Sequence, residues 1–293
     1  MELLRFRRFP RRAFTLVELT IVLGIIVALS ILAIPAISSR KSANDMTKVA
    51  TALKSVLDQA RAYAQANNTY TWVGFYEEDA SQSSTNPPTK GTGRLVMAIV
   101  ASTDGTNLGA DVSSNVTGTA NYIDPTRLQA VGSLVKIDNV HLPLFVIPSP
   151  TIDCSKFDCT VFDNRPPIQN DGTGIGYNQS RFGELNAAAP NTAPYESTNL
   201  GLTKFPFRYP VSTNIANTQY TFQRTLRFSP TGENRINSTY DVRSVIELGV
   251  VQTRGNATPV PISGGGTSAE AFAGNVGAVQ IGGLDGVVRI YKR

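Results

Sequence analysis

Few residues in this chain have the types and spacing that enzyme chemistry needs. His141 is the only histidine, and it lies in an apolar, strand-like run just before Pro143. A general base needs a hydrogen-bonding partner, and the sequence offers His141 no obvious one, so a structural role is favoured. The chain has no Gly-x-Ser-x-Gly elbow, and Gly172-Thr-Gly-Ile-Gly does not fit the dinucleotide pattern. We therefore predict no catalytic site and no enzyme activity.

Three consecutive carboxylates, Glu77-Glu78-Asp79, follow a run of aromatic and β-branched residues. The simplest interpretation is a solvated loop at the end of a strand. Calcium is the alternative, because hard cations bind carboxylate and carbonyl oxygens in loops. Asp104-Gly and Asp171-Gly offer further carboxylates, but no spacing singles out one site. We therefore predict no metal site and no cofactor, with calcium left open.

The two cysteines, Cys154 and Cys159, are separated by Ser-Lys-Phe-Asp. In an exported domain such a pair favours a disulfide that closes a short loop. A metal site is the weaker alternative, because the chain has no second cysteine pair and a single histidine. We expect the disulfide.

One carboxylate, Glu18, stands at the start of a long apolar stretch. Leu19–Ser39 carries no formal charge and, as a helix, would be about 30 Å long, which matches the hydrocarbon core of a bilayer. Five arginines precede it: Arg5, Arg7, Arg8, Arg11 and Arg12. Positive charge before such a segment keeps the N-terminus in the cytoplasm and sends the following chain across the membrane. An acid within such a helix is costly and needs a reason.

The position of Glu18 suggests two explanations for a carboxylate at the start of this apolar helix. A carboxylate at a helix start is stabilised by the helix dipole. Alternatively, cleavage after the small residue Ala13 would make Phe14 the new N-terminus, and its charged amine could pair with Glu18 of the same or a neighbouring subunit. Pro35 interrupts the helical hydrogen bonding and predicts a kink or a locally melted turn.

The run Ala13-Phe-Thr-Leu-Val-Glu18 resembles the processing signal of type IV prepilins and pseudopilins. The resemblance implies cleavage between Ala13 and Phe14 by a prepilin peptidase, N-methylation of Phe14, and roles in assembly for Glu18 and Pro35. Ala13 departs from the usual glycine before the cut. The resemblance also implies a bacterial inner-membrane protein with one membrane pass and a periplasmic C-terminal domain. Its partners would be other pilin or pseudopilin subunits and the assembly platform of the inner membrane.

The charge balance argues against a polyanion partner. The formal net charge is +5, but the first 13 residues hold five Arg and one Glu, which leaves 22 basic and 21 acidic residues. Nucleic-acid binding is therefore not favoured, although the basic tail Arg289, Lys292 and Arg293 keeps a weak phosphate contact open.

The order of predicted elements is one helix followed by strands. Apolar residues at spacings of three and four continue the helix to about Ala66, and Asn67-Asn68 is a plausible stop. Strands are expected over 69–76, 94–101, 134–147, 220–229, 242–252 and 276–292, the last as a hairpin about Gly282–Gly286. This order is similar to the pilin-like α+β fold, in which a long N-terminal helix, with a membrane half and an amphipathic half, packs on an antiparallel sheet. The expected segments are a leader (1–13), a membrane helix that also forms the filament core (14–40), an amphipathic helix (41–68) and a β-rich domain with long loops (69–293).

Within that family the chain is most similar to the minor pseudopilin H and FimT group. The similar segments are Ala52–Ala64, Leu226–Gly232 and Gly286–Tyr291, and the resemblance covers about half of the chain. It implies a minor pseudopilin, a structural subunit of a type II protein-secretion pseudopilus or a type IV pilus. The alternatives are a pilus-tip binding module, as an adhesin or a DNA-uptake receptor, and an anchored periplasmic enzyme. The sequence does not separate a secretion pseudopilus from a pilus.

Overall fold

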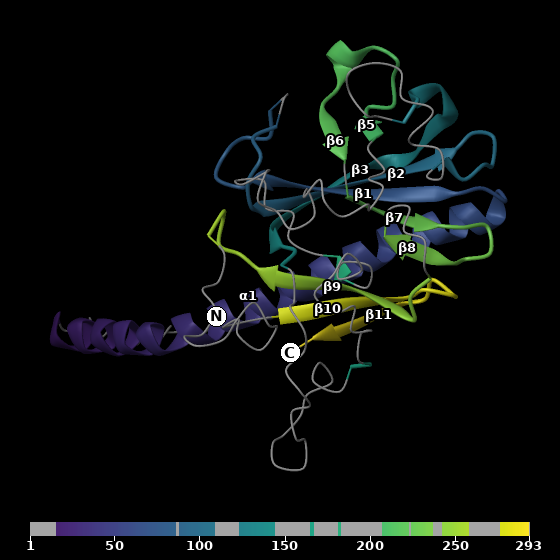
Figure 1. Cartoon of the computed structure of the whole chain (residues 1–293). Helices are drawn as coiled ribbons and strands as arrows, with labels where there is room; N and C mark the ends of the chain where they lie inside the picture. The colour runs from purple at the N-terminus through teal and green to yellow at the C-terminus, as the bar shows by residue number, and fades with distance from the viewer. Residues whose placement is uncertain are drawn as a thin grey trace, which may run out of the picture. The chain divides into compact units, whose positions relative to one another are not determined.

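The structure is a computed structural model. It describes residues 16–85, 88–108, 123–143, 165–166, 181–182, 207–222, 224–236, 242–257 and 276–292. The side chains of residues 28, 30–44, 181, 182, 215 and 224 are not among those described. The chain divides into two compact units, Met1–Asn44 and Asp45–Arg293. The helix α1 (Leu16–Ala66) begins in the first unit and ends in the second (Figure 1).

Within the second unit, α1 buries one face. Its buried side chains recur every three or four residues: Met46, Val49, Ala50, Leu53, Val56, Leu57, Ala60 and Ala64. The helix ends where Asn68 takes a left-handed backbone conformation, with φ of 49°. The N–H of Thr69 donates to Ala64 O at 3.0 Å, which closes the last turn. Asparagine tolerates this conformation better than most residues, so the predicted stop at Asn67-Asn68 is confirmed.

Among the described residues, a nine-stranded sheet is the largest element of the second unit. Its order is β11-β10-β9-β3-β2-β1-β7-β8, and β4 pairs with β9. All of its pairings are antiparallel except the one between β4 and β9. A separate two-stranded ribbon consists of β5 and β6. The strands are β1 (Thr71–Asp79), β2 (Gly93–Ser102), β3 (Leu128–His141), β4 (Arg181–Phe182), β5 (Phe207–Tyr209), β6 (Tyr220–Phe222), β7 (Arg224–Phe228), β8 (Asn234–Ile236), β9 (Val245–Gln252), β10 (Val276–Gly282) and β11 (Val288–Lys292).

The large sheet is narrowly joined at its centre. β3 and β9 pair through two residue pairs, Val140–Gln252 and His141–Val251. We call β3-β2-β1-β7-β8 the first half-sheet and β9-β10-β11 the second. A further link is the hydrogen bond from the N–H of Asn234, in β8, to Gly283 O at 2.7 Å, in the turn after β10. The two half-sheets are therefore joined at two separate places.

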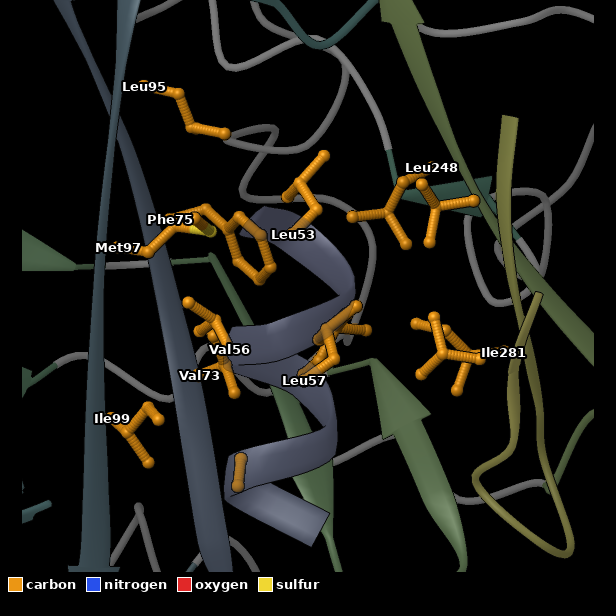
Figure 2. Packing of buried hydrophobic residues seen from close by; sticks show 14 of the residues in the cluster. Leu53, Val56, Leu57, Val73, Phe75, Leu95, Met97, Ile99, Leu248 and Ile281 are labelled. Carbon is orange, nitrogen blue, oxygen red and sulfur yellow. The ribbon is translucent and has the colours of Figure 1, made fainter. Parts of the chain in front are cut away.

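The half-sheets hold the buried part of α1 between them. Figure 2 shows Leu53, Val56 and Leu57 of α1 with side chains from β1 and β2 on one side and from β9 and β10 on the other. The residues that meet the helix from the sheet include Val73, Phe75, Leu95, Met97, Ile99, Leu248 and Ile281. Burying a Leu, Val or Ile side chain contributes about 1.5–3 kcal/mol, so this cluster is the main source of stability in the second unit.

The opposite face of the first half-sheet carries a second apolar layer. Trp72, Val96, Ala98 and Val100 pack there with Phe207, Tyr220 and Phe222 from the β5–β6 ribbon. The ribbon lies close to the sheet because β1 has a glycine beneath it. A Cβ on Gly74 would lie 2.6 Å from ring atoms of Phe207 and Phe222. Any larger residue at position 74 would therefore push the ribbon outwards.

The predicted fold class is wrong and needs correction. We expected a pilin-like α+β fold with a long helix, half of it spanning the membrane, packed on a sheet. The second unit is instead organised by the large, mostly antiparallel sheet, which lies on both sides of the segment of α1 that it buries. In the part of the chain that the structure describes, no helix is long and apolar enough to cross a membrane. The prediction failed because it followed local helix periodicity, whereas pairings between distant strands determine the sheet.

Candidate functional site

The first described turns of α1 carry an exposed apolar surface. Ten large apolar side chains there are 50–79% exposed: Leu16, Val17, Leu19, Ile21, Val22, Leu23, Ile25, Ile26, Val27 and Leu29. In the described part of the chain, the other large hydrophobic residue exposed to this degree is Leu284. Because the ten occupy almost consecutive positions, they surround the helix instead of forming one stripe. A helix that is apolar all round requires an apolar environment.

Glu18 lies in the first turn of α1, between the exposed side chains of Val17 and Leu19. Its position near the helix N-terminus suits a carboxylate, because the unpaired N–H groups there carry partial positive charge. Thr20 satisfies its hydroxyl within the helix, donating from Oγ1 to Val17 O at 2.9 Å. Between Leu16 and Leu29, Glu18 is the one residue with an ionisable side chain.

The structure does not describe the side chains of the other residues predicted to act in processing, assembly or disulfide formation. Ala13 and Phe14 lie outside the described residues, as do Cys154 and Cys159. Pro35 lies within α1, but its side chain is not described. The cleavage site and the disulfide thus stay predictions from the sequence.

Glu77 and Glu78 correct the prediction of a solvated loop. Both belong to β1 and are only 1% exposed. Glu77 Oε1 accepts the backbone N–H of Leu142 at 2.8 Å, and Glu77 Oε2 lies 2.8 Å from His141 Nδ1. His141 is itself buried, so the partner that the sequence did not reveal is Glu77, 64 residues away. The pair fixes the end of β3 where it meets β9, a structural role.

Glu78 points to a different set of donors. It accepts from Arg94 Nη1 at 3.1 Å, from Ser84 Oγ at 3.0 Å and from Lys136 Nζ at 3.4 Å, and Tyr220 donates a short hydrogen bond to it. Burial alone would raise the pKa of Glu78, but the hydrogen bonds from Tyr220 and Arg94 outweigh it, and the pKa is lowered. Burial and the nearby Glu78 carboxylate raise the pKa of Tyr220. The carboxylate is thus held ionised, and Tyr220 stays a hydrogen-bond donor.

The Glu78 cluster contains a close Ser84–Lys136 contact, which could suggest a nucleophile with its base. Lys136 Nζ donates both to Ser84 Oγ and to the Glu78 carboxylate. A general base must accept a proton, whereas Lys136 Nζ is the donor in both of these contacts. Tyr220 brings the β5–β6 ribbon into the same cluster. The arrangement therefore ties the ribbon to β1 and β3.

A third polar cluster lies on β9 and β10. Glu247 and Gln280 are cross-strand partners, and Gln280 Nε2 donates to Glu247 Oε2 at 2.8 Å. Arg165 Nε donates to the same oxygen at 2.8 Å, and Pro166 O accepts from Gln280 Nε2 at 2.8 Å. These contacts attach Arg165–Pro166 to the second half-sheet. Nothing in the local sequence indicated this cluster, because its members come from three distant segments.

The calcium alternative gains no support from the described carboxylates. Within these parts of the chain, no group of three or more His, Cys, Asp or Glu side chains could hold a metal ion. Glu77 and Glu78 accept hydrogen bonds from separate donors, and Asp79 Oδ1 accepts from the N–H of Ser81 at 2.8 Å.

In the basic tail, Lys292 Nζ donates to Thr47 Oγ1 of α1 at 3.1 Å. One of the three tail cations therefore already has a partner within the chain.

Comparison with protein-family models, with curated proteins and with solved structures gave no match.

Proposed function

We propose that this chain is a structural subunit, most similar to a minor pseudopilin, of a bacterial type II secretion pseudopilus or type IV pilus. It performs no chemistry and acts by packing its N-terminal helix against those of other subunits. The observation that carries the proposal is the exposed apolar surface of α1 from Leu16 to Leu29, with Glu18 as its one ionisable group. The processing signal at Ala13–Glu18 supports the same assignment.

The magnitude of the exposed surface supports a partner for this segment. Fully burying a Leu, Ile or Val side chain is worth about 1.5–3 kcal/mol. Ten such side chains at half exposure or more therefore amount to on the order of 10 kcal/mol, comparable with the stability of a whole domain. A monomer in water would not tolerate that cost, so the segment is covered by lipid before assembly and by neighbouring helices after it.

Glu18 would provide specificity within this apolar contact. Apolar helices in an apolar environment gain little from the hydrophobic effect when they associate, so polar pairs and close packing decide their register. After cleavage at Ala13, the charged amine of Phe14 is the natural partner of the Glu18 carboxylate in a neighbouring subunit. Pairing offsets the cost of placing both charges in low dielectric and would set the stagger between helices.

The proposal includes a location and a set of partners. The uncharged stretch Leu19–Ser39 and the basic leader favour a single-pass protein of the inner membrane with its C-terminal domain in the periplasm. Its partners would be the prepilin peptidase, the inner-membrane assembly platform and other pilin or pseudopilin subunits.

The test is incorporation of the Glu18→Ala chain into filaments. The full chain is expressed with the prepilin peptidase and the other subunits, and its amount is compared between the membrane and sheared-filament fractions. We expect normal membrane insertion and at least a tenfold loss from filaments. Asp45→Ala is the matched control, because Asp45 is a partly exposed acid of α1 whose ion pair with the exposed Lys48 is long, at 3.7 Å. Normal incorporation of Glu18→Ala would overturn the pairing argument.

Processing is tested separately by intact mass and N-terminal sequencing with and without the peptidase. A product that begins at N-methylated Phe14, only in the presence of the peptidase, is expected. An uncut chain would mean that Ala13 is not accepted and would remove the filament role.

A further inference from the structure

We draw no further inference here: the strongest candidate, the buried Glu77–His141 pair beside the two-residue junction of β3 and β9, carries none because its hydrogen bonds belong to the structural contact already described and no observation links them to a ligand or to opening of the junction.

Discussion

Removing the Glu77 carboxylate should weaken the junction between the two half-sheets. Glu77 is 1% exposed and accepts two hydrogen bonds at 2.8 Å, from Leu142 N–H and from His141 Nδ1. A hydrogen bond to a charged group contributes about 1.5–3 kcal/mol. Glu77→Ala removes both acceptors, so we expect the free energy of unfolding to fall by about 3–6 kcal/mol. Glu77→Gln keeps one acceptor oxygen and should cost about half as much.

The assay can use the single tryptophan of the chain. Trp72 is fully buried in β1, so its fluorescence reports unfolding of the second unit during a urea titration of the full chain in detergent. Asp79→Asn is the matched control, because this partly exposed carboxylate at the end of β1 has hydrogen bonds with Ser81 and Asn256, away from the junction, and Asn retains an acceptor. We expect the control to change stability by less than about 0.5 kcal/mol.

A clear result would refute the reasoning. If Glu77→Ala lowers the free energy of unfolding by less than about 1 kcal/mol, the two hydrogen bonds do not stabilise the junction. The NMR signal of His141 gives an independent check, since it is the only histidine. Its chemical shift should change in Glu77→Gln and stay unchanged in Asp79→Asn.

Two further predictions concern the first half-sheet. Gly74→Ala should destabilise the second unit by about 1–3 kcal/mol, because its Cβ would lie 2.6 Å from the rings of Phe207 and Phe222. Gly24→Ala, with no atom within 4 Å of the added Cβ, should leave urea unfolding unchanged, and equal effects of the two would contradict the packing argument. The lowered pKa of Glu78 means that its contribution to stability is complete above its unfolded value of about 4.5 and is lost as the pH falls through the folded value. Wild-type stability should therefore decline below about pH 4.5 more steeply than that of Glu78→Gln, and parallel curves would show that the cluster does not depend on this charge.

Local sequence patterns predicted some elements of the fold well. The hairpin of β10 and β11 was predicted from Gly282–Gly286, and Gly286 there takes a φ of 64° that favours glycine. The buried face of α1 followed from apolar residues at spacings of three and four. Both signals depend on residues within a few positions of each other, which is why the sequence alone was sufficient.

Contacts between distant residues were not predictable in this way. A run of three carboxylates is typical of a loop, yet Glu77 and Glu78 are buried because His141, Arg94 and Tyr220 supply donors from other strands. The fold class failed for the same reason, because the order of the nine strands depends on pairings that no local pattern encodes.

The buried polar clusters also bear on where function lies in this chain. A catalytic group needs a lone pair or proton that remains available to a substrate. In the described residues, the Glu77 carboxylate is engaged by Leu142 and His141, and the Glu78 carboxylate by four donors: Ser84, Arg94, Lys136 and Tyr220. Groups committed in this way stabilise a fold, and removing one leaves its partners buried and unpaired. The exposed apolar segment of α1 is the opposite case, because its large side chains are half exposed or more, and it is the surface on which the proposed assembly depends.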